Sequence, residues 1–284
     1  MVPSAREARM KIGIVAPANR MDPAVAERVK QFAAGLYPNR VTLQIHPQCF
    51  LSSGHFAGDD QARAAAFVEV ANDPSIDAVW FARGGYGSCR ILESALPKLT
   101  DAAKKKTYLG YSDMGSLLGA LYVKGFPNLV HGPMASDLAR QGGEAAIARS
   151  LAYLVDRDSA SLEPAKDGSR RVAFNIETLA GLIGTPYEPD LTGHVLLLEE
   201  IAEYMYRIDR SLFHILSSPK MRGLAGLRLG RCSDIPTNDP DFGKTEVEVA
   251  EYWCKRTGIP YLGRADIGHD VDNKVVPFGD PRVA

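Results

Sequence analysis

YLGYSDMGSLLGALY, residues Tyr108–Tyr122, is the stretch around which the rest of the chain is organised. It opens with a short apolar run, turns through Gly110–Asp113, and continues with apolar residues at helical spacing. A strand that breaks sharply into a helix, with a serine at the break, has the geometry of a nucleophile elbow. The serine at this break is Ser112, and the first N–H groups of the helix would lie beside its hydroxyl, where they can stabilise an oxyanion.

The same turn also has a simpler interpretation. Met114 occupies the place of the second glycine in the usual G-x-S-x-G pattern, and Gly115 follows it. A Gly-Tyr-Ser-Asp turn is common at ordinary helix N-termini, with Ser112 or Asp113 as the capping residue. The elbow is therefore a hypothesis that depends on a base and a carboxylate from elsewhere in the chain.

The composition is that of a globular protein. The chain has 284 residues, of which 45% are hydrophobic and 24% are charged, and its formal net charge is −1. No global field favours nucleic acid or an anionic membrane surface, so neither is expected as a partner. The four cysteines form no C-x-x-C pair, which indicates neither a zinc site nor a disulfide framework. Because no signal peptide or membrane-spanning run is visible, we expect a cytoplasmic protein.

Strands and helices alternate along the first half of the chain. Apolar runs at Lys11–Pro17, Val41–His46 and Ala78–Ala82 predict buried strands, and the segments between them predict helices. Leu129–Met134 predicts a further strand. This alternation predicts an α/β fold with a parallel sheet and helices on both of its faces.

A polar run without aromatic residues, DRDSASLEPAKDGSRR, separates the two halves of the chain. We interpret it as a linker, residues 156–171, between an N-terminal domain of residues 1–155 and a C-terminal domain of residues 172–284. The linker is expected to be exposed and to be the most protease-sensitive interior segment. In the second half, His194–Leu198 predicts a strand that ends on two glutamates and is followed by a long helix.

A glycine-rich loop, Arg83–Ser88, follows one predicted strand and precedes a predicted helix. Phosphates bind at such places in nucleotide-binding folds, but the loop lacks the full G-x-G-x-x-G spacing. Gly84 and Gly85 favour a different use, in which the backbone comes close to a reacting group and an N–H donates to an oxyanion.

Two further residues supply the chemistry that a serine nucleophile needs. Glu199 ends an apolar strand, and active-site carboxylates lie at such strand ends in many α/β folds. The alternative is that Glu199 and Glu200 simply begin the following helix. His269 lies in a turn rich in Gly and Asp, where it can face a cleft, and the alternative is a histidine with a structural role. The histidines show no H-E-x-x-H motif or other known ligand spacing, so no metal is expected.

Eight segments, in order, resemble the LD-carboxypeptidase family of serine peptidases, and the similarity runs along nearly the whole chain. Each segment alone is weak, whereas eight in the right order are specific. The segments are KIGIVAP (Lys11–Pro17), SGHFAGDDQARAAAF (Ser53–Phe67), ARGGYGSCRIL (Ala82–Leu92), LGYSD (Leu109–Asp113), HGPM (His131–Met134), GTPYEPD (Gly184–Asp190), LLLEEIAEYMYRIDR (Leu196–Arg210) and GRADIGHDVDNKVVPFG (Gly263–Gly279).

The resemblance implies an N-terminal α/β domain with a parallel sheet, a smaller C-terminal α/β domain, and a homodimer. It places the nucleophile at Ser112, the catalytic carboxylate at Glu199 and the general base at His269. It also implies that the oxyanion donors are the backbone N–H groups of Asp113 and Gly85.

One departure from the family concerns the acidic pair. The usual Leu-Glu-Asp reads Leu198-Glu199-Glu200 here, so a shift of one residue toward Glu200 stays open. A carboxypeptidase must also hold a free α-carboxylate, and Arg83 is a candidate because it precedes the glycine pair. The alternative is that Arg83 pairs with a carboxylate of the chain.

By this resemblance the chain is an LD-carboxypeptidase that needs no cofactor and removes the terminal D-Ala from murein tetrapeptides in cell-wall recycling. The alternative within the family is an immunity-type peptidase or amidase that cleaves a peptidyl-nucleotide such as processed microcin C. A hypothesis from a different class is a non-catalytic α/β protein that holds a phosphate at Arg83–Ser88.

Overall fold

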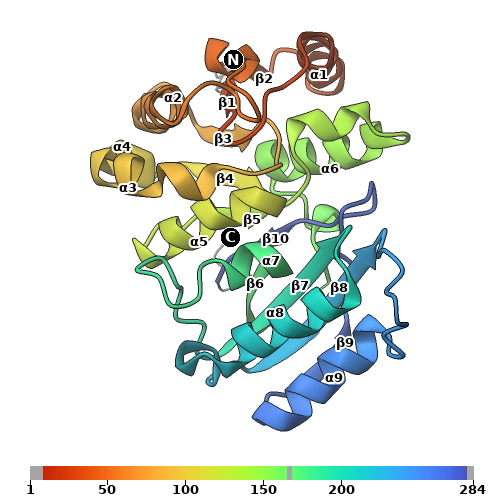
Figure 1. Cartoon of the computed structure of the whole chain (residues 1–284). Coiled ribbons are helices and arrows are strands. Elements are labelled where there is room, and N and C mark those ends of the chain that lie inside the picture. The colour runs from red at the N-terminus through yellow and green to blue at the C-terminus, as the bar shows by residue number, and fades with distance from the viewer. Residues whose placement is uncertain (1–8, 165–167, 280–284) are drawn as a thin grey trace.

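Two β-sheets with their covering helices make up the protein in the computed structural model, which describes residues 9–164 and 168–279 (Figure 1). The first sheet has six strands in the order β10-β5-β4-β3-β1-β2, and the second has four in the order β6-β7-β8-β9. All the pairs are parallel except that of β10 with β5. The predicted α/β fold, with a parallel sheet in the first half and a smaller α/β unit in the second, is therefore confirmed, and the sheet of the second half is parallel as well.

The first sheet is built from short apolar strands, as their sequence predicts. These strands are β1 (Met10–Val15), β2 (Val41–Ile45), β3 (Ala78–Phe81), β4 (Thr107–Gly110), β5 (Leu129–His131) and β10 (Val276–Pro277). In such a sheet, loops at the carboxyl ends of the strands meet along one edge. The loop after β3 and the loop after β4 are the glycine-rich loop and the serine turn of the sequence, so the fold brings them together.

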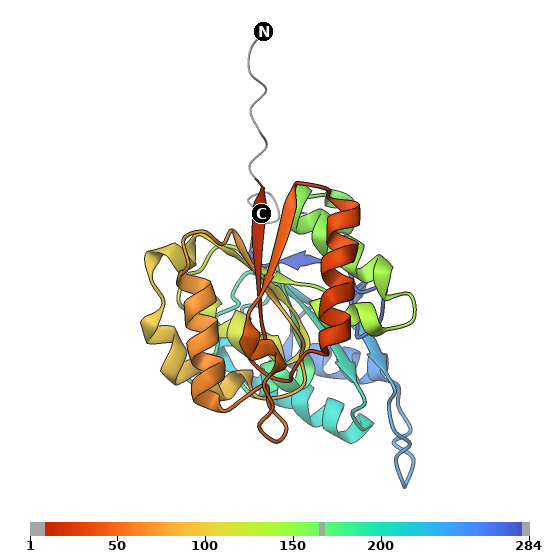
Figure 2. The same ribbon diagram turned by 90° about the horizontal axis from the view of Figure 1, so that it is seen from above.

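Helices cover both faces of the first sheet. The helices α1 (Pro23–Leu36) and α6 (Gly143–Asp156) pack against one face, and α1 begins at an Asp22 cap before a proline. The other face is covered by α2 (Asp60–Asn72), α3 (Leu92–Ala95), α4 (Asp101–Lys104) and α5 (Gly115–Val123). Seen from above, α1 and α2 lie on opposite sides of the strands (Figure 2).

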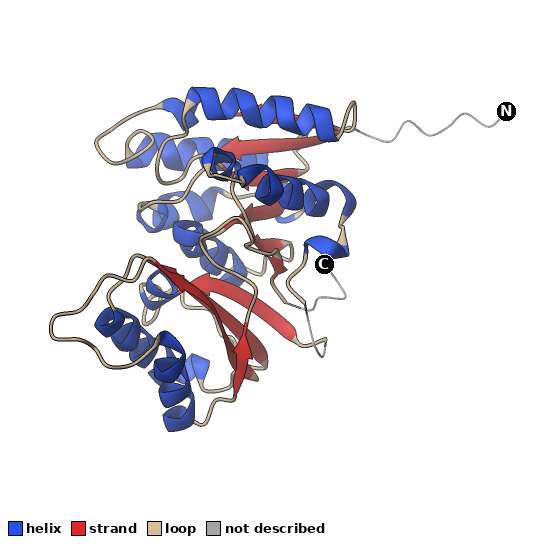
Figure 3. Ribbon diagram, turned by 90° about the vertical axis from the view of Figure 1, so that its right-hand side faces the viewer, coloured by secondary structure: helices blue, strands red, loops and turns tan. Residues whose placement is uncertain are grey.

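The second sheet carries its helices on one side (Figure 3). Its strands are β6 (Arg170–Asn175), β7 (His194–Ile201), β8 (Gly226–Ser233) and β9 (Tyr261–Arg264). The helices are α7 (Ile176–Ala180), α8 (Met205–Ser217) and α9 (Glu246–Thr257). Strand β7 runs through both glutamates and α8 begins only at Met205, so the alternative that Glu199 and Glu200 begin the helix is wrong.

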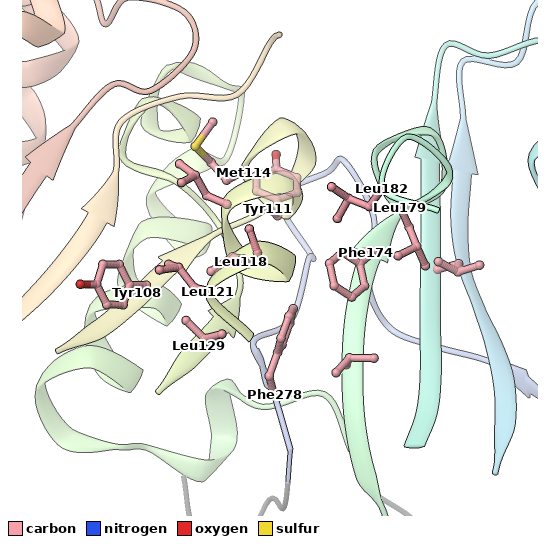
Figure 4. Close-up of a cluster of buried hydrophobic side chains, with 14 of the residues drawn as sticks. Tyr108, Tyr111, Met114, Leu118, Leu121, Leu129, Phe174, Leu179, Leu182 and Phe278 are labelled. Atoms are coloured by element: carbon pink, nitrogen blue, oxygen red, sulfur yellow. The ribbon is translucent and has the colours of Figure 1, made fainter. Parts of the chain in front are cut away.

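The two sheets share one hydrophobic core. Side chains of β4 and α5 face side chains of β6, α7 and the C-terminal segment, including Leu118, Phe174, Leu182 and Phe278 (Figure 4). Strand β10 then adds Val276–Pro277 to the first sheet through β5. Burial of a shared apolar surface holds the two sheets in one arrangement, and a site that spans them can therefore be rigid.

The segment between the two halves is partly buried. Ser161 and Glu163 are only 3% and 1% exposed, so the prediction of an exposed linker is wrong for these residues. The carboxylate of Glu163 forms ion pairs with Arg171 of β6 at 2.9 Å and with Arg228 of β8 at 2.7 Å. The proposed linker also includes residues 165–167, which lie outside the described residues, and the domain boundaries stay a prediction.

The same contacts explain why the sequence analysis missed strand β6. The strand begins with two arginines inside a polar run, and it does not look like a buried strand on its own. Arg171 is nevertheless buried, because the carboxylate of Glu163 neutralises it. This partner becomes visible only in the folded chain.

Replacing Glu163 with alanine should destabilise the protein by about 3–5 kcal/mol, because Arg171 and Arg228 would lose their shared carboxylate. Asp156→Ala is the control, since it removes an exposed ion pair to Arg40 at 2.6 Å and should cost less than about 1 kcal/mol. Urea unfolding of both variants measures the two losses. Losses of similar size would contradict the prediction.

Candidate active site

Ser112 lies at the tight turn between β4 and α5, as the elbow hypothesis predicts. The four residues of β4 are fully buried, and the chain turns into a short 3₁₀ segment, Ser112–Met114, that leads into α5. Ser112 has φ +59°, a left-handed conformation that L-residues rarely adopt. Such a strained turn raises the hydroxyl above the sheet edge.

His269 brings the two halves of the chain together at Ser112. Its Nε2 lies 2.9 Å from Ser112 Oγ, and its Nδ1 forms a short hydrogen bond with Glu199 Oε2. Glu199 is fully buried and His269 is 8% exposed. The structure thus places the three predicted residues in one continuous hydrogen-bonded line, with the serine from the first sheet and the carboxylate from the second.

Glu199 and Glu200 point to opposite faces of β7. Glu199 faces His269, whereas Glu200 faces α7, where it accepts hydrogen bonds from Asn175 Nδ2 at 2.6 Å and from the N–H of Glu177 at 2.9 Å. Neighbouring side chains of a strand point to opposite sides of the sheet, so only one of the two can reach the histidine. That residue is Glu199.

The electrostatics of these groups differ. Burial by itself lowers the pKa of His269, but the negative charge and the hydrogen bond of Glu199 outweigh it and raise the pKa above its ordinary value. Burial, together with the charge of Glu199, raises the pKa of Glu200 to about 7. His269 therefore has the stronger tendency to accept a proton that a general base needs.

The glycine-rich loop lies against the serine turn. A Cβ on Gly84 would lie 3.2 Å from Ser112 Oγ, and one on Gly85, at φ +109°, would lie 2.4 Å from Asn19 Cγ. The carboxylate of Asp113 accepts hydrogen bonds from the N–H groups of Gly87 at 3.3 Å and Ser88 at 2.8 Å, which fixes the loop to the turn. Within the described residues, the N–H groups of Gly85 and Asp113 have no hydrogen-bond acceptor.

Two hollows adjoin Ser112, and Gly85 lines both. One has a volume of about 640 Å³, and it is lined by His269 and by the charged residues Asp22, Arg83, Asp137 and Arg140. The other, of about 450 Å³, is lined by residues that include Glu177, Glu200 and Glu203. Ser112 is therefore open to both hollows.

Arg83 has an exposed side chain in the larger hollow. Its Nη1 is 3.5 Å from the carbonyl oxygen of Arg20, and it forms no ion pair with a carboxylate of the described chain. The alternative in which Arg83 pairs with such a carboxylate is therefore not observed.

The sequence analysis did not identify a second group of residues around the histidine. The Tyr111 ring packs on the His269 ring, with 4.9 Å between the centroids, and its hydroxyl donates to Asp137 Oδ1 at 3.2 Å. Arg140 pairs with Asp137 at 3.0 Å and donates to the carbonyl oxygen of His269. Asp137 and Arg140 follow the HGPM segment closely, and this acidic–basic pair was the one available signal.

The described residues contain no group of three or more His, Cys, Asp or Glu side chains placed to hold a metal ion. None of the helices within 9–164 and 168–279 has the length and apolar character needed to cross a membrane.

Family models and known proteins match this chain along most of its length. Residues 12–132 match the LD-carboxypeptidase N-terminal domain, and residues 169–282 match the LD-carboxypeptidase C-terminal domain. The Synechocystis sp. protein slr1534 is 31% identical over 234 residues, which cover 80% of this chain and 75% of that one. The murein tetrapeptide carboxypeptidase of Pseudomonas aeruginosa is 28% identical over 249 residues, which cover 81% and 79%.

Solved structures show the same fold. The muramoyltetrapeptide carboxypeptidase from Oxalobacter formigenes is 24% identical, with a TM-score of 0.74 over 94% of this chain and 93% of that one. The protein MccF, in complex with glutamyl sulfamoyl guanosine, is 17% identical, with a TM-score of 0.79 over 95% and 91%. The family resemblance of the sequence is thus confirmed: the chain belongs to the LD-carboxypeptidase family and is a hydrolase of the serine carboxypeptidase type.

Proposed function

We propose that the chain removes the terminal D-Ala from murein tetrapeptides with a Ser112–His269–Glu199 triad, as a cytoplasmic enzyme of cell-wall recycling. The observation that carries this proposal is the 2.9 Å contact between Ser112 Oγ and His269 Nε2, with Glu199 on the other ring nitrogen. A serine, a base and a carboxylate in this order are the arrangement that activates a serine hydroxyl.

In the proposed mechanism His269 accepts the proton of Ser112 as the serine oxygen attacks the scissile carbonyl carbon. Glu199 holds the imidazole with Nε2 toward the serine and stabilises the imidazolium that forms. The imidazolium then gives its proton to the leaving amine, the C–N bond breaks, and an acyl-enzyme remains. A water molecule, deprotonated by His269, releases the acyl group and restores Ser112.

The oxyanion of each tetrahedral intermediate is proposed to lie between the backbone N–H groups of Gly85 and Asp113. Both groups adjoin Ser112, and neither has an acceptor within the part of the chain that the structure describes. Donors that are already in place cost no reorganisation when the negative charge forms. Asp113 supports this arrangement by fixing the glycine-rich loop through its side chain.

The substrate class rests on the relatives and on the charge of the site. A relative from Pseudomonas aeruginosa is named a murein tetrapeptide carboxypeptidase, and this supports a murein peptide as the substrate. The larger hollow beside Ser112 carries the cation of Arg83, which suits a peptide with a free terminal carboxylate. We also propose a homodimer, on the family resemblance alone.

A second function is favoured by the fold of MccF, whose structure holds glutamyl sulfamoyl guanosine. The triad chemistry would be the same if the chain cleaved a peptidyl-nucleotide. The hollow of about 450 Å³ beside Ser112 is a second place where part of either substrate could bind.

A tetrapeptide that ends in an L-centre joined to D-Ala should be cleaved, whereas one that ends in D-Ala-D-Ala should not, and EDTA should change neither result. Amidation of the terminal carboxylate should lower kcat/KM at least about tenfold, because Arg83 in the larger hollow loses its charged partner. Mass spectrometry of the products, with a peptidyl-adenylate mimic in a parallel reaction, measures these rates. Preferred cleavage of the mimic would favour the second function.

A further inference from the structure

The larger hollow contains a second cation, Arg140, that is held in a fixed position beside the histidine. We propose that Arg140 binds the terminal carboxylate of the substrate's leaving residue and is the main determinant of carboxypeptidase specificity. This inference rests on the proposed function, because it assumes that the bond to a terminal residue is broken at Ser112.

Two contacts hold the guanidinium of Arg140 in place. Its Nε pairs with Asp137 at 3.0 Å, and its Nη1 donates to the carbonyl oxygen of His269. Asp137 is 8% exposed and is itself held by the N–H of Met134 at 2.8 Å and by the hydroxyl of Tyr111. The remaining nitrogen, Nη2, has no hydrogen-bond partner within the described chain. It is therefore available to a ligand in the hollow.

Arg83 lines the same hollow but is held less firmly. Within the described residues, its hydrogen bonding is limited to the 3.5 Å approach to the carbonyl oxygen of Arg20, and the residue is exposed. A side chain that is already ordered loses less conformational entropy when it binds. Arg140 should therefore contribute more to carboxylate binding than Arg83, which adds attraction from a more flexible position.

The smaller hollow beside Ser112 differs from the larger one in its charged residues. Glu177 and Glu203 line it, and no arginine, lysine or histidine is present in its described lining. A carboxylate there would be repelled, so the free end of the peptide is directed toward Arg140. The larger hollow holds arginines beside Asp22 and Asp137, whereas the described lining of the smaller hollow holds none, and this difference sets the direction in which the peptide lies.

Arg140 also contacts the turn that carries His269, and a test must separate this effect from substrate binding. Arg149 offers a matched control, because its Nη1 donates to the carbonyl oxygens of Val271 and Asn273, each at 2.9 Å. It thus holds the same turn but does not line the hollow. Loss of either arginine can disturb His269, whereas only loss of Arg140 should change how the carboxylate is recognised.

The experiment measures kcat/KM for a tetrapeptide with a free terminal D-Ala and for the same peptide with a C-terminal amide. In Arg140→Ala the ratio of acid to amide rates should fall about 10- to 100-fold, as expected for loss of a charged hydrogen bond. The ratio should be unchanged in Arg149→Ala, even if both rates drop. Arg83→Ala should lower the ratio less than Arg140→Ala does. Arg140→Lys should keep part of the preference for the free acid over the amide.

Because the ratio is taken on one enzyme, partial unfolding of a variant cancels. If both rates fall equally in Arg140→Ala, the arginine only positions His269 and the inference is overturned. A wild-type enzyme that cleaves acid and amide equally would instead contradict the proposed carboxypeptidase function itself. The two failures are thus distinguishable.

Discussion

Ser112→Ala and His269→Ala are each expected to lower kcat by at least about a thousandfold, because the two residues act as one unit in the proposed mechanism. The hydroxyl and the imidazole lie 2.9 Å apart, so removal of either leaves the other without a function in proton transfer. The double variant should be little worse than either single one. Residual hydrolysis would come from the oxyanion donors and from substrate binding.

Single-turnover and steady-state rates on a murein tetrapeptide measure these losses, and covalent labelling of Ser112 by a serine-directed phosphonate provides a second readout. The label should be absent in Ser112→Ala and slow in His269→Ala. Additive effects in the double variant would show that the two residues act independently, and the triad would then be the wrong mechanism.

Glu199→Gln is expected to lower kcat by about a hundredfold or more, and Glu200→Gln by much less. Only Glu199 contacts Nδ1 of His269, where an amide would favour the wrong tautomer and would not stabilise the imidazolium. Glu200 is the matched control, since it is the neighbouring buried glutamate but bonds to Asn175 and to backbone N–H groups. A greater loss in Glu200→Gln than in Glu199→Gln would show that Glu200, and not Glu199, is the catalytic carboxylate.

The pH dependence supplies a further readout of the same variant. His269 must be neutral to accept a proton, and Glu199 raises its pKa, so wild-type kcat/KM should be lost as pH falls through a value above about 6.5. Glu199→Gln removes the negative charge that raises the pKa of His269. The loss of kcat/KM at acidic pH should therefore occur at a lower pH in this variant than in the wild type. If the loss of kcat/KM at acidic pH occurs at the same pH in both enzymes, a group other than His269 is responsible for it.

The sequence by itself predicted the features that depend on neighbours along the chain. The serine turn could be identified because an apolar strand, a tight turn and a helix follow one another within Tyr108–Tyr122. The parallel sheet of the first half followed from the alternation of strands and helices. The roles of Ser112, Glu199 and His269 came from the family resemblance, and the structure places these residues in contact.

The tertiary structure decided what depends on residues far apart in the sequence. Which of two adjacent glutamates reaches His269 depends on which face of β7 meets the first sheet, and a pattern of period two cannot tell the two faces apart. Strand β6 was missed because Glu163 neutralises its buried arginine. Arg140 lies 129 positions from His269, and no local spacing could reveal their contact. Local patterns determine the elements, whereas pairing of distant polar groups is determined only when burial brings them together.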